Sequence, residues 1–308
     1  MKRRMRWMAL AASALTWAAA QAAEVVFQPV AEGVYAFVGE TEGRTYENEA
    51  LNANFGLVVT PAGALLIDSG ASWQGARQIA EAAKKVTPQP IKWVINTGGQ
   101  DHRWMGNGFF QAQGAETMAH AGAEADMRAR GPEHLKANAP VLKEKLDGTG
   151  VVLPTRWLQE ADTKLDLGGV EVRVVYRGGG HTPGDLMVWL PRTGVVFTGD
   201  VVYVDRILGL HPVSRTRTWL QSFEALEALN PRVVVPGHGR VTTLAQAQKD
   251  TGALLKALRA DMGRAVEAGT DLATAVKGFD ATPFRHLQHV DVWLPQLANR
   301  TYLEMEME

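Results

Sequence analysis

The alternation of apolar and polar positions divides the chain into short strands followed by helices. Apolar, largely β-branched runs bounded by turn residues predict strands at residues 25–30, 34–38, 55–60, 64–68, 91–95, 117–119, 170–176, 186–190, 195–197 and 232–235. Apolar residues spaced three and four apart predict helices at residues 72–85, 121–146, 216–229, 244–266, 270–279 and 284–305. No linker rich in proline, glycine and serine divides these elements, so we expect one domain of strands packed between helix layers.

The first 22 residues follow a different pattern. Four basic residues precede the apolar, alanine-rich run 7–20, and Ala20-Gln21-Ala22 fits a small-x-small cleavage site. This order is typical of a secretory signal peptide, and the run is too short for a stable membrane span. We therefore expect a signal peptide at residues 1–22 and a mature domain at 23–308, with a helical extension from about residue 244. A retained N-terminal anchor is the alternative.

Charge and cysteine content narrow the partners and the cellular compartment that we expect. The 308-residue chain has 32 basic and 33 acidic residues, and loss of the signal peptide would remove four basic ones, leaving a net charge of 28 − 33 = −5. Nothing in this balance suggests nucleic acid or an anionic membrane surface as a partner. There is no cysteine, so neither a disulfide nor a thiolate ligand is available. We expect a periplasmic protein whose partner is a small-molecule substrate, with no membrane association after cleavage.

Three glycine-rich segments carry the candidate chemistry. They are Gly-Gly-Gly-His-Thr-Pro-Gly-Asp at 178–185, Phe-Thr-Gly-Asp at 197–200 and Val-Pro-Gly-His-Gly at 235–239. Each follows a predicted strand, and together they present His181, Asp200 and His238 from turns at strand ends. Two imidazoles and a carboxylate are a ligand set suited to Zn²⁺. One such residue alone could be an incidental turn residue, but three together favour a shared site.

These motifs, together with Asp68 in Leu-Leu-Ile-Asp-Ser-Gly and the frame Asn96-Thr97 … Gly106-Asn107, resemble the metallo-β-lactamase superfamily over roughly residues 30–245. The resemblance implies an α+β fold, a four-layer αββα sandwich with its site at one edge, where strand-end loops from both halves meet. The tail Asn-Arg-Thr-Tyr-Leu-Glu at 299–304 is similar to the SoxH-like branch, the quinoprotein relay system zinc metallohydrolases. That branch implies an association with a periplasmic quinoprotein dehydrogenase system.

One segment departs from the family pattern, which has His-x-His-x-Asp-His between Asn-Thr and Gly-Asn. Without a gap, Gly98 and Gln100 stand at the first two histidines, His102 at the aspartate and Arg103 at the last histidine. Two ligands of the first metal site are then missing, and arginine cannot bind a metal because it stays protonated. A one-residue shift would instead restore Asp101-His102 as the Asp-His pair. The sequence leaves both registers open.

Two functions follow from this segment. In the first, one Zn²⁺ is held by His102, His181, Asp200 and His238, or by three of them with water, and activates a water nucleophile. Asp101 would accept the proton, and Arg103 and Gln100 would contact the substrate. In the second, Arg103 replaces the metal charge and pairs with Asp200, giving a metal-free binding or accessory protein.

We favour the first, a periplasmic hydrolase with an atypical mononuclear zinc site. β-Lactamase activity ranks third, because the ligand set it normally needs is incomplete. Among the remaining histidines, His120 could lie at the site edge or be packed, and the others are expected in structural or surface positions, namely His134, His211, His286 and His289. Arg206 and Trp104 are further candidates for the pocket lining, and a packing role is the alternative for Trp104.

Overall fold

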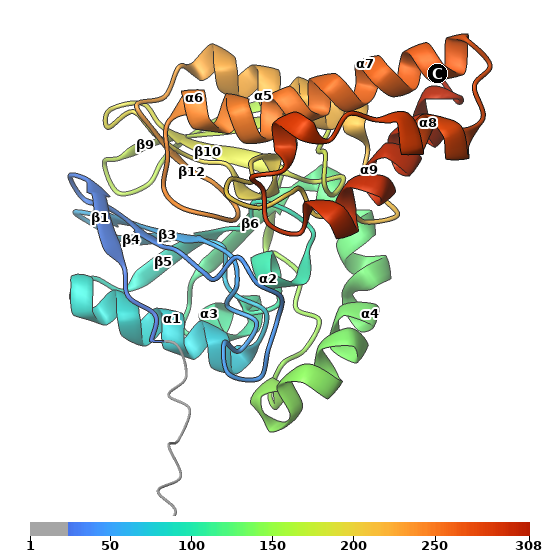
Figure 1. The fold of residues 1–308 in the computed structure, drawn as a ribbon. Helices are drawn as coiled ribbons and strands as arrows, with labels where there is room; N and C mark the ends of the chain where they lie inside the picture. The colour runs from blue at the N-terminus through green and yellow to red at the C-terminus, as the bar shows by residue number, and fades with distance from the viewer. Residues whose placement is uncertain (1–23) are drawn as a thin grey trace, which may run out of the picture.

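Two β-sheets lie face to face between two helical layers (Figure 1). The computed structural model describes residues 24–308, and the signal peptide expected at 1–22 lies outside them. The first sheet has the order β1 to β7, with strands Gln28–Ala31, Val34–Phe37, Phe55–Thr60, Gly63–Ile67, Ile91–Ile95, Glu116–His120 and Arg156–Leu158. The second has the order β12-β11-β10-β9-β8, with strands Val233–Val235, Val195–Phe197, Leu186–Leu190, Glu171–Tyr176 and Asp162–Asp166.

The helices divide between the two outer faces. In Figure 1, α1 and α3 lie below the sheets, whereas α5, α6 and α7 lie above them. The helices are α1 Trp73–Val86, α2 Asp101–Trp104, α3 Asn107–Ala112, α4 Glu124–Leu142, α5 Thr216–Leu229, α6 Leu244–Ala247, α7 Ala253–Glu267, α8 Leu272–Gly278 and α9 Val290–Met305. One π-helical turn, Gln248–Gly252, joins α6 to α7.

The alternation of side-chain direction along the strands explains how each sheet packs against its neighbouring layers. In β4, Leu65 and Ile67 face the cluster between the sheets, whereas Ala64 and Leu66 face α1. Because β4 is covered on both sides, it contains a continuous apolar run rather than a polar–apolar alternation. A third cluster lies outside the second sheet, where Trp219 and Phe223 of α5 pack against the apolar side chains of α7 and α9. The αββα sandwich expected from the sequence is therefore the observed architecture.

The differences from the predicted elements are local. β7 and β8 were not predicted, because Arg-Trp-Leu is too short and Asp-Thr-Lys-Leu-Asp contains one apolar residue. The first strand is shifted to Gln28–Ala31 from the predicted 25–30. The last helix begins at Val290 rather than at 284, because a 3₁₀ turn, Thr282–Phe284, and the irregular residues 285–289 precede it.

Parallel strand pairing brings the motif segments together. β4 and β5 pair in parallel in the first sheet, and β11 and β12 pair in parallel in the second. Parallel strands end at the same sheet edge, so the loops after all four carry their side chains to one end of the sandwich. Asp68, the 96–106 segment, Asp200 and His238 follow these strands in turn.

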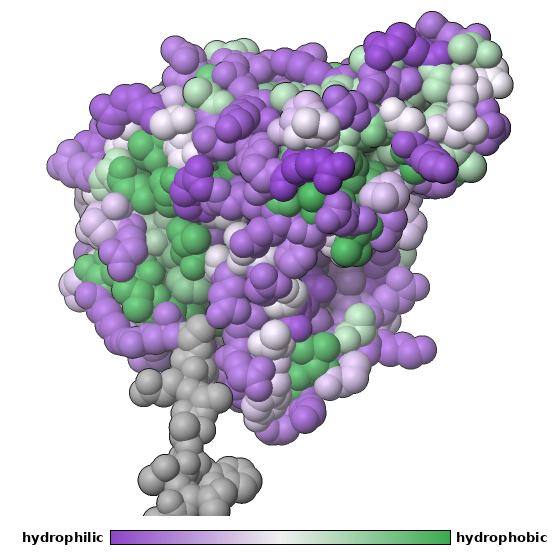
Figure 2. Space-filling view, in the orientation of Figure 1, coloured by the Kyte–Doolittle hydropathy of each residue, from purple (hydrophilic) through white to green (hydrophobic). Residues whose placement is uncertain are grey.

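The viewed surface is mostly hydrophilic, with apolar residues gathered in separate patches (Figure 2). Exposed large apolar side chains in the described part include Val26, Val38 and Val292. Within residues 24–308, none of the helices combines the length and apolar character that a membrane crossing requires.

Candidate metal site

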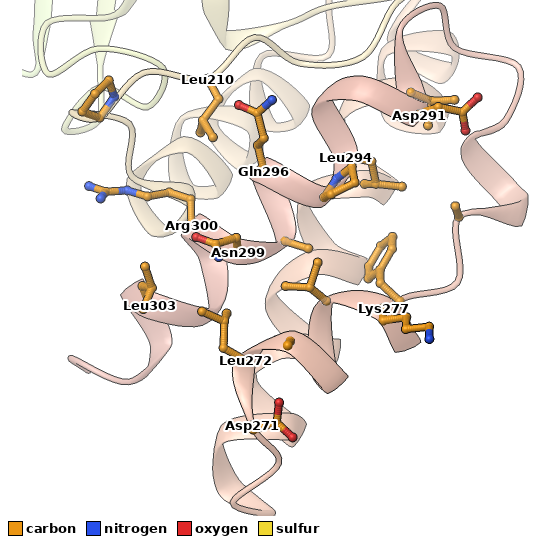
Figure 3. Close-up of a pocket in the computed structure, with 18 of the residues that line it drawn as sticks. Leu210, Asp271, Leu272, Lys277, Asp291, Leu294, Gln296, Asn299, Arg300 and Leu303 are labelled. Carbon is orange, nitrogen blue, oxygen red and sulfur yellow. The ribbon is translucent and has the colours of Figure 1, made fainter.

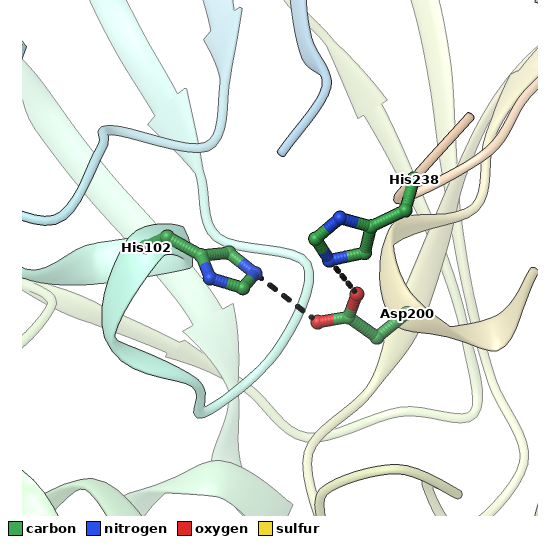
Figure 4. Close-up of side chains that lie close together, drawn as sticks. All are labelled: His102, Asp200 and His238. Atoms are coloured by element: carbon green, nitrogen blue, oxygen red, sulfur yellow. Dashed lines mark ion pairs between the residues drawn. The ribbon is translucent and has the colours of Figure 1, made fainter. Parts of the chain in front are cut away.

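His102, Asp200 and His238 converge at the sheet edge (Figure 4). Each contributes one ligand atom, these atoms lie within 4.8 Å of one another, and all three side chains are buried. The Nε2 atom of His102 lies 3.6 Å from Oδ2 of Asp200, and Nε2 of His238 lies 3.4 Å from Oδ1. With metal–ligand bonds of about 2 Å, tetrahedral zinc ligands are separated by similar distances, so the spacing suits one cation.

His238 is oriented by its surroundings. Its Nδ1 lies 2.9 Å from the backbone carbonyl of Asn52, which favours the tautomer with the proton on Nδ1 and leaves Nε2 free to bind a metal. The ring of Tyr203 stacks on the imidazole at a centroid distance of 4.8 Å. The ring is therefore held in the orientation that aims Nε2 at Asp200.

His102 reaches the same point from α2, in a segment where the sequence predicted only a loop. Its buried Nε2 has no hydrogen-bond partner within the described chain. Its Nδ1 lies 3.2 Å from Nη2 of Arg44, a donor that favours the proton on Nε2. Binding a metal through Nε2 therefore requires that Arg44 release this contact. His102, rather than Asp101, lies beside Asp200, as in the register without a gap.

Arg103 lies beneath this cluster with no exposed surface. Nε and Nη2 donate to the two oxygens of Asp200 at 3.0 and 2.6 Å, and Nη1 donates to Asp68 at 2.9 Å. The two remaining N–H groups donate to the carbonyl oxygens of Asn54 and Gly237, each at 3.2 Å. All five donors are used within the protein, so none remains for a substrate, contrary to the substrate contact expected for Arg103.

Asp101 uses its carboxylate to hold neighbouring groups. Oδ1 accepts from Arg44 and from the backbone N–H of His102, and Oδ2 accepts from Asn138 at 2.8 Å. Burial alone would raise the pKa of Asp101, but the charge of Arg44 and the neighbouring imidazoles lower it below its usual range. A carboxyl group with a lowered pKa is a weak proton acceptor, so this arrangement suits positioning of Arg44 and His102 better than proton transfer.

The remaining predicted residues form a separate pair. Nε2 of His181 lies 2.7 Å from Oε1 of Gln100, so the donor set around Asp200 does not include His181. Gly98 packs against the turn formed by Thr182 and Asp185, where a Cβ would collide with Oδ1 of Asp185. The first metal site of the family pattern is thus replaced by a histidine–glutamine contact and a closely packed glycine.

Burial and the charge of Arg103 together set the pKa values of the cluster: both lower the pKa of His102, whereas they oppose each other at the two carboxyl groups. Desolvation lowers the pKa of His102 to about 3, helped by Arg103, and lowers that of His238 to about 4. Burial would raise the pKa of Asp200, but Arg103 and the two histidines hold it well below its usual range. Burial raises the pKa of Asp68 to about 6 against the opposing effect of Arg103. The cluster therefore presents neutral imidazoles and an ionised Asp200 at neutral pH, the protonation states that a metal needs.

A cavity of about 190 Å³ opens onto the three histidines His102, His181 and His238. Its lining also includes residues to which the sequence gave no site role or only a tentative one, namely Arg44, Asn52, Tyr203, Arg206, His211 and Trp293. These come from loops and from α9 without a recognisable motif, and of them only Arg206 was a sequence candidate for the pocket lining. Of the two roles considered for Trp104, the structure shows packing, because its side chain is fully buried and lies near His134.

A larger cavity of about 1190 Å³ lies between α8 and α9 (Figure 3). Its wall is mainly apolar, with Leu272 and Leu294 facing the interior and charged residues such as Asp271 and Lys277 at its edges. It shares Leu210 and His211 with the smaller cavity but contains none of the clustered ligands. The candidate metal ligands therefore adjoin the smaller cavity and not the larger one.

The other histidines and the C-terminal tail have structural contacts. His120 stacks on Tyr176, and His286 lies 2.8 Å from Asp250. His211, for which a structural or surface position was expected, instead lies in the cavity wall with its ring 4.7 Å from that of His181. In the tail, Glu304 accepts hydrogen bonds from the first turn of α5.

Comparisons with known proteins agree with this architecture. The family model of the metallo-beta-lactamase superfamily matches residues 48–238. The metallo-beta-lactamase type 2 of Bacillus cereus is 28% identical over 205 residues, which cover 65% of this chain and 72% of that protein.

Two solved structures share the fold. The metallo-beta-lactamase from Pontibacter korlensis has a TM-score of 0.60 at 22% identity and covers 75% of this chain and 99% of its own. The mono-zinc form of FIM-1 from Pseudomonas aeruginosa has a TM-score of 0.61 at 20% identity, covering 77% and 98%. The match of the family model over most of the chain, together with the sandwich and its edge site, shows that this protein belongs to the metallo-beta-lactamase superfamily.

Proposed function

We propose that this protein is a hydrolase that uses a single metal ion, Zn²⁺, held by His102, Asp200 and His238. The observation that carries the proposal is the convergence of these three buried donors, with Nε2 of His102 left without a partner. A buried polar atom without a partner is costly, and a cation at this point would remove that cost.

The charge balance favours a cation at this point. Asp68 and Asp200 surround one guanidinium, that of Arg103. With both carboxylates ionised, the buried network carries one negative charge in excess, which is expensive away from water. Neutral histidines cannot compensate it, because desolvation lowers the pKa of both His102 and His238 far below neutrality.

The protein's own side chains would act by holding the metal ligands in place. A zinc ion with three protein ligands and one open position lowers the pKa of a bound water to about 7. The carbonyl of Asn52 and the ring of Tyr203 fix His238. Arg103 anchors Asp200 from beneath through two hydrogen bonds, which holds its oxygens toward the histidines. Asp101 accepts from the backbone N–H of His102 and holds Arg44, and Gln100 holds His181 at the cavity wall.

A second function, metal-free binding, is favoured by one specific observation. Arg103 already pairs with both oxygens of Asp200, as expected if a guanidinium replaces the metal charge. In that case the cavity would bind a small molecule without hydrolysing it.

Metal analysis separates the two functions. Protein purified without chelator should contain about one equivalent of Zn²⁺, and chelation should lower its melting temperature. His238→Ala should abolish zinc binding, whereas His286→Ala, which removes a histidine outside the cluster, should retain it. The metal site would be rejected if His238→Ala retained all of its zinc. It would also be rejected if the protein were metal-free and neither zinc nor chelator changed its melting temperature. Either result would support the binding protein.

Hydrolysis would be tested with a panel of a β-lactam, a lactone, a thioester, an amide and a phosphoester. Zinc-dependent turnover of any member that disappears in His238→Ala would support the hydrolase. Turnover of the β-lactam alone would favour a β-lactamase, the activity that gives the relatives their name.

We further propose a periplasmic location and a link to a quinoprotein dehydrogenase system. The N-terminal basic and apolar pattern supports export, and the tail at 299–304 supports the SoxH-like branch. Cell fractionation of the full-length chain tests the location. Co-purification with a quinoprotein dehydrogenase from the periplasmic fraction tests the association, and its absence would count against the branch.

A further inference from the structure

We infer that the larger cavity, between α8 and α9, binds an aliphatic chain of the substrate, while the polar head that contains the scissile bond enters the smaller cavity. The substrate is then an amphiphilic small molecule that bears an alkyl or acyl chain. This inference rests on the proposed function, because it names the substrate class of the same site.

The first argument is that the smaller cavity is too small to hold a whole ligand of ordinary size. Its volume is about 190 Å³, whereas sites for small molecules commonly measure about 300–1,000 Å³. A substrate of that size with its polar head beside His102 and His238 therefore extends into a neighbouring space. The larger cavity offers about 1190 Å³ for the part that remains.

The second argument is that the two cavities adjoin. Leu210 and His211 line both of them. The preceding residue, Gly209, lies beside the candidate metal site, because its carbonyl oxygen is 3.2 Å from Nδ1 of His181. A chain that leaves the smaller cavity along this loop would therefore enter the larger one at Leu210.

The third argument is the chemistry of the larger cavity. Its wall is built largely from aliphatic side chains of α8 and α9, among them Leu272, Val276, Val290, Leu294 and Leu303. Leu210 enters from the loop and Leu272 from α8 (Figure 3). An aliphatic chain that moves from water to such a wall is stabilised in proportion to the apolar area that it buries. At the junction, burial lowers the pKa of His211 to about 4, so this imidazole is uncharged at neutral pH.

The fourth argument is the origin of the wall. α8 and α9 both lie beyond residues 48–238, which match the family model. Trp293 of α9 lines the smaller cavity, and the next residue, Leu294, lines the larger one. The C-terminal extension therefore connects the two spaces and adds an apolar surface to the shared fold.

Binding of neutral primary alcohols tests the apolar site without any contribution from zinc. Butanol, hexanol, octanol and decanol differ only in chain length, and calorimetry on the chelated protein would give their dissociation constants. Leu272→Gln makes the wall polar on α8. Leu303→Gln does so on α9 at a residue that is 38% exposed, where a substitution has little effect on folding. Leu229→Gln is the matched control, because Leu229 is also partly buried but lines neither cavity.

Affinity for the wild-type protein should increase by about three- to four-fold with each added methylene, because each one buries further apolar area. Leu272→Gln and Leu303→Gln should each weaken decanol binding by about three-fold or more. Leu229→Gln should leave it unchanged.

Alkyl hydroxamates test whether the two cavities accept one molecule, because the hydroxamate group binds zinc and the chain would extend into the larger cavity. On zinc-loaded protein, decanohydroxamate should bind at least about ten-fold more tightly than acetohydroxamate. Leu272→Gln should remove most of this gain, whereas Leu229→Gln should retain it.

Equal affinity for butanol and decanol would overturn the inference, as would decanol binding that neither Leu272→Gln nor Leu303→Gln changes. Absence of the gain with decanohydroxamate on zinc-loaded protein would separate the two cavities and also overturn it. A dimer in sedimentation that Leu272→Gln dissociates would assign the larger cavity to a second copy of the chain, against the inference. A protein that holds no zinc but binds decanol through Leu272 would reject the hydrolase and leave the apolar subsite standing.

Discussion

At the scale of single residues, the exchange of a family histidine for Arg103 changes what the site needs from its neighbours. A histidine at this position would bind a metal from the cavity side, whereas the longer guanidinium reaches past Asp200 to Asp68 and two backbone carbonyls. The guanidinium of Arg103 thus supplies, from within the protein, part of the positive charge that a second metal ion would supply in the family pattern. This arrangement leaves one set of ligands, in which His102 takes the position of the family's aspartate.

Arg103→Gln tests the structural importance of this charge. The substitution leaves Asp68 and Asp200 buried without a cation, which should lower the free energy of unfolding by about 3–5 kcal/mol. Urea unfolding measured by circular dichroism gives the value. Arg128→Gln, which breaks an exposed pair with Glu124, should cost less than about 1 kcal/mol. Equal, small losses in the two variants would show that Arg103 does not stabilise the buried carboxylates.

Some of these site residues could be predicted from the sequence because the features that indicate them are local. A carboxylate or imidazole in a glycine-rich turn after a buried strand points toward a sheet edge, which is how Asp200 and His238 were found. The partner of Gln100 depends on the path of a separate loop, so it could not be read from spacing. Arg44, Tyr203 and Trp293 enter the cavity from segments whose local patterns resemble ordinary surface loops or helices.

At the scale of elements, the C-terminal helix contributes to the start of α5. The carboxylate of Glu304 in α9 accepts from the backbone N–H groups of Thr216 and Arg217 at 2.7 and 3.1 Å, and from the hydroxyl of Thr216. The first N–H groups of a helix have no partner within the helix, and the N-terminus favours negative charge. A residue 88 positions away therefore acts as the cap of α5.

Glu304→Ala should remove this cap and lower the free energy of unfolding by about 1–2 kcal/mol, since losing a capping side chain costs that amount. Thermal or urea unfolding measures the change. Glu306→Ala, at an exposed position two residues later, should stay within about 0.5 kcal/mol of wild type. A Glu304→Ala protein as stable as the Glu306→Ala control would show that water caps α5 equally well.

Element type was predicted best where the apolar pattern is long. The α5 and α7 segments have helical apolar stripes, and β3 and β4 have continuous apolar runs, so their types follow from local pattern. α2 and α3 were not predicted, because they are short and belong to a segment that contains glycines 98, 99, 106 and 108. Their helical form depends on tertiary contacts, such as the indole of Trp104 donating to the carbonyl of Gly99 at 2.9 Å.

At the scale of the whole molecule, many histidines become buried on folding without being protonated. Six have pKa values below the ordinary value, mainly through burial, namely His102, His120, His134, His181, His211 and His238. Unfolding returns each to a pKa near 6.5, so the unfolded chain binds more protons over the range between the two values. Stability must therefore rise with pH across that range.

We expect the chelated protein to lose stability as the pH falls from 6.5 to about 4, the value for His211 and His238. Asp68 and Asp185 oppose this, because burial raises the pKa of Asp68 to about 6 and that of Asp185 well above its usual value, so the folded protein binds protons there that the unfolded chain releases. Six histidines outweigh two carboxyls, so the slope should be at least about 1.4 kcal/mol per pH unit.

Urea unfolding at pH 6.5, 5.5 and 4.5 in the presence of chelator measures the slope. His238→Gln should reduce it, because one buried titrating group is then absent. A stability that is constant or that rises on acidification would show that these histidines are protonated in the folded protein. Asp101 and Asp200 do not complicate the window, since their lowered pKa values affect stability below pH 3.8.

The close packing of Gly98 has a consequence for attempts to rebuild a two-metal enzyme on this scaffold. Asp185 is held in place by the backbone and hydroxyl of Thr182 and occupies the space that a side chain at position 98 would need. Reinstating histidines at 98 and 100 would therefore have to be accompanied by a redesigned 182–185 turn and a smaller residue at 103. Laboratory evolution from this chain toward a dinuclear centre would therefore need several substitutions at once, because a side chain at position 98 alone would collide with Asp185.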